Sequence, residues 1–567
     1  MRLTRYSYCD RMDAQRPWAR WAPSAGLVAV VLFGAWTRSS GFTSKDLWFD
    51  DAWGVLPSKV GLGTAVHMVN TTPLFTLLVR SWVQLHPGHA WWDQVPAFVL
   101  GLASIVAVYA LLRYFAAWWP VALAGALVIA VSPVAATYST RVKQFNGDIL
   151  FACALLWCFE RWRRDATRRR AIELGVLGAL AMLFSATTAI VVVSVAAAAV
   201  LCGVVERLRR VDVAWLLGIV GVAGVVEYVV WLRHLSHSLY AGWTARGYIL
   251  SVRSLHRVAY SFQAMGTGVL HWMLGVPTGH PPYPSATVTA AGLAIAALVA
   301  VGLVAIVAPP LVRCARHLRE LPGALVAPAL CVALAVLLAV VGVSPFGGGR
   351  TDEVLYPSLL VLVVGAVAGV RKPSAERAPA RSRAVLAGVV VVAVACVAVG
   401  VTNRATYPVT SVANAYAKLR PHVRAGDLIV VDPWVTFTWA DDGVTASAIS
   451  LHSSFFPWSQ GFHVVSRDPR VIISTNYFFP DAQYARLAQR TDRIWYVGVG
   501  RRASASRPTP ASRLLRTRNF RSLERLGWLP THTAYYASHV IAILMVHRPA
   551  TPLMACQSCG VAPPRAR

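Results

Sequence analysis

The sequence has little charge for its length. Only 14% of its 567 residues are Asp, Glu, Lys or Arg, whereas 56% are hydrophobic and the mean hydropathy is +0.52. Soluble domains carry roughly a quarter charged residues, so a soluble protein of one or two ordinary domains is excluded. Apolar runs of about 18 residues or more recur between residues 26 and 401. Each is long enough to cross about 30 Å of hydrocarbon as a helix.

Acidic residues and lysine are also scarce. The chain has 25 Asp and Glu against 54 Lys and Arg, which gives a net charge of +29, and only five of the basic residues are lysine. In a soluble chain this charge would suggest a nucleic-acid partner. Here the basic residues gather in short segments between apolar runs, as the positive-inside rule describes. We therefore predict membrane lipids, and no nucleic acid, as partners.

Cysteines at the spacing of a metal site are almost absent. The chain has nine cysteines, and only Cys556 and Cys559, in CQSCG, lie close together in a pattern of interest. No second pair of this kind and no histidine pair accompanies them. A local disulfide or two free thiols therefore explains this pair better than zinc does.

The apolar runs predict a polytopic α-helical protein of the plasma membrane with about eleven spans. Residues 175–205 are long enough for two of these spans, and we divide them at residues 185–188. With a cytoplasmic N-terminus, this count places the basic segments that begin at Glu160, Glu206 and Arg371 in the cytoplasm. The polar loops on the outer face are then residues 41–92, 136–145, 233–285 and 344–356.

The composition changes near residue 402, and we place a domain boundary there. Residues 1–401 are predicted to form a transmembrane catalytic domain. Residues 402–567 are more balanced in composition, with strand-like runs that begin at Asp427, Arg493 and His539. We predict that they form an external, soluble α/β domain with a flexible tail.

Two adjacent carboxylates stand in the first external loop, 41–92. Asp50 and Asp51 lie between Trp48 and Trp53. Carboxylates among aromatic side chains at a membrane interface are costly to ionise unless a cation or a substrate group meets them. One could take a proton from a hydroxyl while the other orients it or holds a divalent ion, and the indoles could line the substrate cavity. The alternative is a helix start beside an interfacial aromatic belt.

Two further clusters bring basic residues to the predicted outer face. The segment STRVKQFNGD carries Arg141, Lys143 and Asp148, of which Asp148 is a candidate residue of the substrate cavity, and PFGGGR places three glycines before Arg350. An ammonium and a guanidinium suit a phosphate group, and glycines allow a close approach of backbone to ligand. The alternatives are a lysine that reaches the interface and a flexible turn with a solvated arginine.

Together these motifs resemble the GT-C superfamily of membrane glycosyltransferases, in particular the protein mannosyltransferase and lipid A aminoarabinose transferase type. The resemblance covers about residues 20–401 and is carried by FDDAW, TPLF, STRVKQFNGD and PFGGGR. It implies Asp50 as the catalytic base with Asp51 as its partner. It also implies that Lys143, Arg350 and Arg141 bind the phosphate of a polyprenyl-phosphate sugar, and that Asp51 could hold a divalent metal. Phe145 departs from the family, which commonly has tyrosine there.

The resemblance leads to a functional hypothesis with two alternatives. The chain would be an inverting glycosyltransferase that moves a sugar from a polyprenyl-phosphate donor to a hydroxyl of a cell-envelope glycan, lipid or protein on the outer face. A transporter or flippase for a lipid-linked glycan is the first alternative. Glu227, inside the seventh predicted span, favours it, although Glu227 could instead line the catalytic cavity. The other alternative is an inactive scaffold.

Overall fold

The computed structural model describes most of the chain. The described residues are 17–43, 46–67, 72–116, 118–206, 209–230, 243–273, 275–276, 288–316, 325–349, 351–369, 378–405, 412–441, 443–444, 448–452, 461–473, 486–499, 518–537 and 540–548.

The chain divides into two compact units. The first, here called the helical unit, comprises residues 1–44, 57–407 and 457–459. The second, here called the sheet unit, comprises residues 45–56, 408–456 and 460–567. The segment 45–56, which carries Asp50 and Asp51, thus folds with the C-terminal part of the chain. This differs from the predicted boundary, which includes the segment in the transmembrane domain, residues 1–401.

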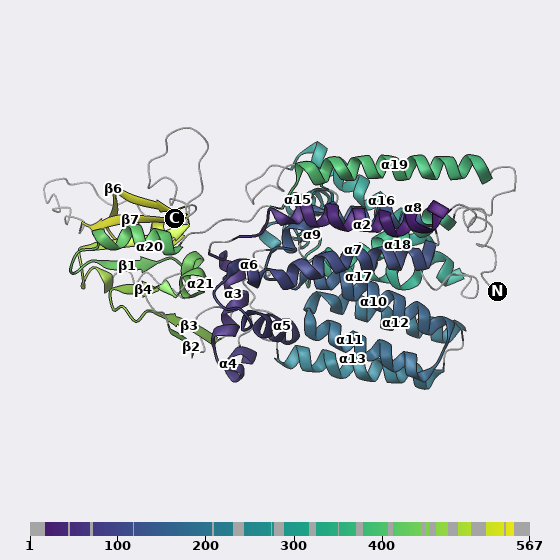
Figure 1. Ribbon diagram of the computed structural model, residues 1–567, viewed down its shortest axis with the longest axis horizontal. Helices are drawn as coiled ribbons and strands as arrows, with labels where there is room; N and C mark the ends of the chain where they lie inside the picture. The colour runs from purple at the N-terminus through teal and green to yellow at the C-terminus, as the bar shows by residue number, and fades with distance from the viewer. Residues whose placement is uncertain are drawn as a thin grey trace, which may run out of the picture. The chain divides into compact units, whose positions relative to one another are not determined.

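The long helices of the helical unit run side by side (Figure 1). They are α2 (Pro17–Ser39), α7 (Val95–Ala116), α8 (Trp119–Val131), α10 (Phe145–Arg164), α11 (Arg168–Phe184), α12 (Ala189–Glu206), α13 (Arg210–Val230), α15 (Leu255–Gly268), α16 (Ala290–Arg316), α17 (Val326–Val340), α18 (Tyr356–Gly369) and α19 (Ala378–Thr402). Shorter elements are η1 (Leu56–Lys59), α4 (Leu62–His67), α5 (Pro73–Val83), α6 (Ala90–Asp93), α9 (Pro133–Tyr138), η2 (Ala186–Thr188), η4 (Val269–Met273) and η6 (Glu353–Leu355).

The predicted helical character is confirmed, because each predicted apolar run contains a helix. Three helices among the described residues are long and apolar enough to cross a membrane: Ala90–Phe115, Arg210–Val229 and Ala290–Val312. Other apolar helices are shorter, as Trp119–Val131 illustrates. These helices support a membrane protein, and the number of spans stays a prediction.

The predicted division of residues 175–205 coincides with a break between α11 and α12. The backbone of Ser185 is extended, and the short turn η2 follows it. The Thr188 hydroxyl donates to the Ser185 carbonyl at an oxygen–oxygen distance of 2.7 Å. Hydroxyl side chains that bond to nearby backbone compete with helical hydrogen bonding, which explains why the helix stops here.

Two glycines allow the segment that carries Lys143 and Asp148 to pack closely. A Cβ at Gly147 would lie 2.2 Å from Cε1 of Phe184, and one at Gly101 would lie 2.1 Å from Oγ of Ser139. No side chain fits at such distances. The absence of a Cβ therefore lets α10 approach the end of α11 and lets α7 approach the turn after α9.

The sheet unit contains a five-stranded sheet of order β4-β1-β5-β7-β6. The strands β4 (Val471–Ile473), β1 (Leu428–Val431) and β5 (Arg493–Val499) are parallel, and β7 (Val540–His547) is antiparallel to β5 and to β6 (Trp528–Ala537). A separate antiparallel pair consists of β2 (Ala448–His452) and β3 (Gly461–Val465). The predicted α/β character of this part is confirmed, since three of these strands lie at the predicted runs.

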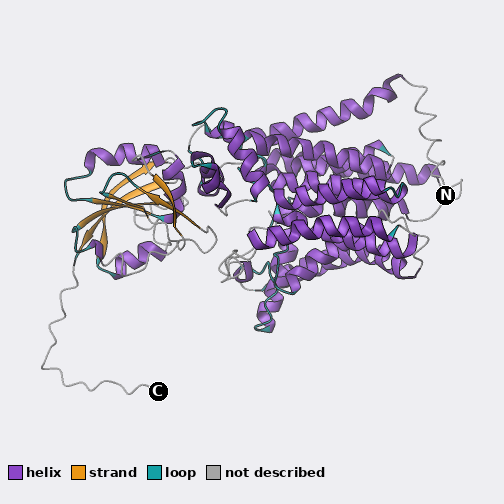
Figure 2. Ribbon diagram, turned by 90° about the horizontal axis from the view of Figure 1, so that it is seen from below, coloured by secondary structure: helices purple, strands orange, loops and turns teal. Residues whose placement is uncertain are grey.

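Helices lie on both faces of the five-stranded sheet (Figure 2). The helices of this unit are α3 (Phe49–Val55), α20 (Val412–Leu419), α21 (Pro433–Asp441) and α24 (Arg518–Arg525), with the short turn η8 (Arg420–His422). The core buries large side chains from the strands and from α24, among them Val430, Ile494, Tyr496, Phe520, Trp528 and Ile541. This apolar core makes the unit a folded support for the elements that pack on it.

Candidate active site

The predicted acidic pair lies in the first turn of α3. Trp48 is the N-cap residue, and its backbone is extended. Asp50 and Asp51 are the second and third residues of the helix, after Phe49, and the backbone N–H of Asp51 donates to the Trp48 carbonyl at an N···O distance of 2.9 Å. Asp51 is fully buried, whereas Asp50 is half-buried. Both carboxylates therefore lie in the helix turn that carries the first backbone N–H groups.

Two tryptophans flank the acidic pair. Both Trp48 and Trp53 are half-buried. Trp53 stacks on Phe437 of α21, with ring centroids 5.5 Å apart. Its indole is therefore part of the packing between α3 and α21.

The second predicted cluster lies in the helical unit, at the turn between α9 and α10. Lys143 is 8% exposed, and its backbone N–H donates to the Arg141 carbonyl at an N···O distance of 2.7 Å. Asp148, in the first turn of α10, is fully buried and accepts a hydrogen bond from the Thr187 hydroxyl. Its other oxygen, Oδ1, is buried without a hydrogen-bond partner. One short segment thus brings a nearly buried ammonium and a buried carboxylate into the bundle.

A buried arginine that the sequence motifs do not predict lies beside this segment. Arg38, near the end of α2, is fully buried. Its Nε donates to Ser139 Oγ at 2.7 Å, and its Nη2 donates to the Ile129 carbonyl at 3.0 Å. The Nη1 group donates to the carbonyls of Gly34 and Ala130. The guanidinium therefore links α2, the end of α8 and the turn that leads to Lys143.

Glu353, in η6, is the acidic counterpart of Arg38. It is fully buried, and both carboxyl oxygens lack a hydrogen-bond partner. Arg38, Asp148 and Asp352 all act on it electrostatically, and η6 packs against α10 and α12. The motif RTDEVLYP contains this glutamate. A glutamate between apolar runs was the one sequence signal that could have identified it.

The glycines before position 350 shape the loop and let it pack closely on the rest of the helical unit. Gly347 and Gly349 have φ values of +79° and +88°, which favour glycine. The Gly349 N–H donates to Asp352 Oδ2 at an N···O distance of 3.1 Å. A Cβ at Gly268 of α15 would lie 2.0 Å from the Gly347 carbonyl oxygen, so the loop also packs directly on that helix. Arg350 lies outside the described residues.

The remaining predicted residues do not join these clusters through any described contact. Glu227, in α13, is 2% exposed, and its Oε1 is buried without a hydrogen-bond partner. Among the side chains that are described, no group of three His, Cys, Asp or Glu residues could hold a metal ion.

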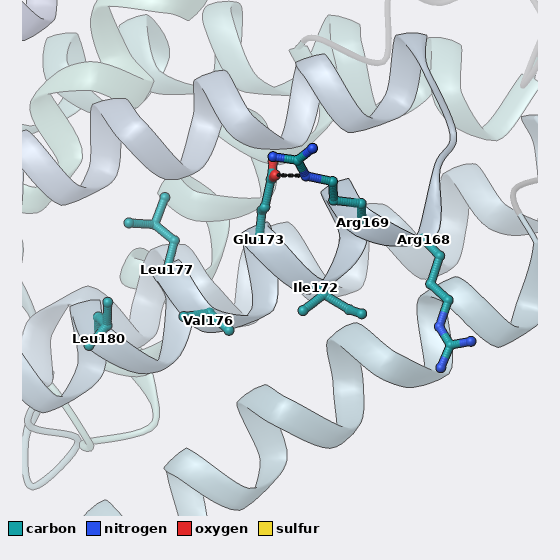
Figure 3. Close-up of a pocket in the computed structure, with 7 residues that line it drawn as sticks. All are labelled: Arg168, Arg169, Ile172, Glu173, Val176, Leu177 and Leu180. Atoms are coloured by element: carbon teal, nitrogen blue, oxygen red, sulfur yellow. Dashed lines mark hydrogen bonds and ion pairs between the residues drawn. The ribbon is translucent and has the colours of Figure 1, made fainter.

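A surface hollow of about 670 Å³ lies elsewhere, on α11. Figure 3 shows its apolar floor, which includes Val176 and Leu180, and the ion pair of Arg169 with Glu173 at 2.9 Å. The residues that line the hollow lie along α11 from Arg168 to Leu180, and none of them belongs to the polar clusters described above. The hollow is therefore not part of the polar clusters.

Residues 70–231 match the family model of dolichyl-phosphate-mannose-protein mannosyltransferases. The chain is similar to these membrane glycosyltransferases. The resemblance to the GT-C superfamily is thus confirmed, and the matched segment contains Lys143, Asp148 and Glu227. It begins after Asp50 and Asp51, so their roles do not follow from the match. No curated protein matches the chain.

Solved structures of two proteins also match. ArnT from Cupriavidus metallidurans is 12% identical in its apo state, over 91% of this chain and 97% of that one, with a TM-score of 0.35. Its structure bound to undecaprenyl phosphate is 12% identical over 92% and 98% of the two chains, with a TM-score of 0.36. The archaeal oligosaccharyltransferase AglB from Archaeoglobus fulgidus, in complex with an inhibitory peptide and a dolichol-phosphate, is 11% identical over 93% and 74%, with a TM-score of 0.45.

We predict that the free energy of unfolding depends on pH through Asp352, which accepts hydrogen bonds from the glycine loop. Burial raises the pKa of Asp352 to about 7, although hydrogen bonds from the amides of Gly349, Gly347 and Gly348 oppose the shift. Because the folded-state pKa is raised, stability from the protonated form is complete below about pH 4 and is lost as the pH rises toward 7. Asp352→Asn cannot ionise and keeps an acceptor oxygen. Its free energy of unfolding relative to wild type should rise by up to about 1.4 kcal/mol per pH unit over this range.

Thermal unfolding of both proteins in detergent at pH 4.5, 5.5 and 7 measures this difference. A constant offset between Asp352→Asn and wild type at all three values would contradict the prediction.

Proposed function

We propose that the chain is an inverting membrane glycosyltransferase that takes a sugar from a polyprenyl-phosphate donor. The observation that carries the proposal is the asymmetry of the acidic pair at the start of α3. Asp51 is fully buried and Asp50 is half-buried, so one carboxylate is accessible to an acceptor while its neighbour is held by the protein. The match of residues 70–231 to a mannosyltransferase family model supports the reaction class.

The proposed reaction is a single displacement at the anomeric carbon. Asp50 takes the proton of the acceptor hydroxyl as its oxygen bonds to that carbon. The bond from the anomeric carbon to the phosphate oxygen breaks at the same time, and the electron pair leaves with the phosphate. The configuration inverts, and the products are the glycosylated acceptor and a polyprenyl phosphate. Negative charge grows on the phosphate, and Lys143 and Arg350 would stabilise it.

A divalent metal is not needed to derive these steps. Asp51 is the residue that would hold one, and no third metal-binding side chain among the described residues joins the pair. We therefore derive no step through a metal. The acceptor in this proposal is a hydroxyl of a glycan, lipid or protein of the cell envelope.

A transporter of lipid-linked glycans is a second candidate, and Glu227 favours it. This carboxylate lies inside a helix long and apolar enough to cross a membrane, and one oxygen is buried without a partner. Intramembrane acids often belong to transport pathways. A transporter would move the lipid-linked glycan without breaking the sugar–phosphate bond.

Replacement of the proposed base separates the two functions. Asp50→Asn keeps the shape of the side chain and loses its basicity, so sugar transfer should fall about 10²- to 10⁴-fold. Asp51→Asn should lower the rate of sugar transfer less than Asp50→Asn does, or its activity should depend on added divalent metal. The measurement is transfer of radiolabelled sugar from polyprenyl-phosphate mannose and related donors by purified protein. Wild-type rates for Asp50→Asn would remove Asp50 from the mechanism, and no transfer by any variant would favour the transporter.

Donor binding should depend on the two proposed phosphate ligands. A charge-assisted hydrogen bond contributes roughly 1.5–3 kcal/mol, so Lys143→Ala and Arg350→Ala should each weaken polyprenyl-phosphate binding about 10- to 150-fold. Lys59→Ala, which removes an exposed lysine of the same unit, is the control and should bind as wild type does. Unchanged affinity in both test variants would show that these residues do not hold the phosphate.

The proposed sidedness places the N-terminus in the cytoplasm and the C-terminal domain outside. Single cysteines at two exposed positions of a cysteine-free protein test it. The Leu85 side chain is in the predicted outer loop, and Arg169 is in a predicted cytoplasmic segment; they are 72% and 88% exposed. In intact cells an impermeant thiol reagent should label position 85 alone. Labelling of position 169 from outside would reverse the orientation.

A further inference from the structure

The segment that carries the acidic pair is fixed to the C-terminal part of the chain by three kinds of contact. Residues 45–56 belong to the sheet unit, although a large part of the chain separates them from the rest of that unit. All of the contacts described below lie within the sheet unit. They therefore show what orients α3 in that unit.

The first contact holds the start of the segment. The Asp46 carboxylate accepts hydrogen bonds from the backbone N–H groups of Val412 and Ala413, the first residues of α20. These amides have no partner within their own helix, and the negative charge at the helix N-terminus is favourable. α20 in turn packs against β6 and β7, so Asp46 is anchored to the sheet.

The second contact is a buried hydrogen bond just before α3. The Thr438 hydroxyl of α21 donates to the Leu47 carbonyl at 2.9 Å, and both residues are buried. A buried carbonyl that loses its donor costs more than the bond itself contributes. This bond therefore specifies where the chain enters the helix.

The third contact is aromatic. Phe437 is 1% exposed and packs against Phe49 and Trp53, with ring centroids 4.6 and 5.5 Å away. Phe49 and Trp53 are four residues apart and lie on one face of α3. Asp50 and Asp51 are turned by about 100° and 200° from Phe49 about the helix axis. The apolar face is used for docking, and the carboxylates are directed away from it.

We propose that α21 is a positioning element for the catalytic carboxylates and that Phe437 and Thr438 are its positioning residues. The C-terminal domain then has a role in catalysis: it fixes the direction in which Asp50 points. This inference rests on the proposed function, because it assumes that Asp50 reacts. Neither Phe437 nor Thr438 is proposed to touch the substrate.

Thr438→Val tests the hydrogen bond with little change of volume. Thr436→Val is the matched control, because Thr436 lies two residues earlier in α21, is equally buried and donates to the Asp432 carbonyl instead. Thr438→Ser keeps the hydroxyl, so it should retain wild-type hydrogen exchange and sugar transfer. Phe437→Ala tests the aromatic contact, and Phe520→Ala, which removes an equally buried ring beside Tyr496, is its control.

Two measurements on the full-length protein decide the outcome. Hydrogen exchange should become about 10-fold faster in residues 46–55 of Thr438→Val and Phe437→Ala, with little change in residues 493–499. Sugar transfer from polyprenyl-phosphate mannose should show kcat lowered about 10- to 100-fold and the donor KM within about twofold. Thr436→Val and Thr438→Ser should resemble wild type in both measurements. Phe520→Ala should lower the unfolding temperature without lowering kcat of the folded protein.

Exchange in residues 46–55 that stays at the wild-type rate in both test variants would overturn the inference. So would faster exchange with an unchanged kcat while Asp50→Asn is inactive, because α3 would then not need α21 for catalysis. If Asp50→Asn itself transfers sugar normally, the proposed function fails, whereas the exchange data still decide whether α21 holds α3.

Discussion

The packing of the helical unit depends on the hydrogen bonds of one buried cation, the guanidinium of Arg38. A guanidinium inside a bundle of apolar helices costs several kcal/mol unless its donors find acceptors and its charge finds a counterpart. Arg38 donates to Ser139 and to the carbonyls of Gly34, Ile129 and Ala130, and Glu353 acts on it electrostatically. These partners come from α2, from the end of α8, from the turn before α10 and from η6. The turn that carries Lys143 is therefore held by the same residue that fixes the spacing of the helices.

The sequence predicted those elements whose physical cause is local. An apolar run of membrane length forms a helix because its backbone must satisfy its own hydrogen bonds in lipid, and β1, β5 and β7 follow from short β-branched runs. Arg38 was not predicted because a single arginine carries little information in so arginine-rich a chain. Its hydrogen bonds join α2 to the end of α8 and to the turn before α10, which are far apart in the sequence, and no local pattern reports such contacts.

The candidate site shows the same limit. The aromatic and acidic residues of FDDAW are visible in the sequence, and the structure places both carboxylates in one helical turn. Their difference in exposure was not predictable, because it depends on how α3 is packed. Nor did the sequence indicate that residues 45–56 fold with the C-terminal part of the chain. That assignment depends on Asp46, Leu47 and Phe49 meeting α20 and α21, whose sequences contain no signal for this partner.

The length of α3 gives these contacts their importance. A helix of seven residues is far below the roughly 12–15 residues that an isolated helix needs to be even marginally stable in water. Its direction must therefore come from tertiary contacts, and the aromatic packing on Phe437 and the bond from Thr438 supply them. A carboxylate on an intrinsically unstable helix can have a defined direction only if a folded domain holds that helix. The sheet unit, with its apolar core, meets this requirement, and this argues against a C-terminal domain that serves only to recruit partners.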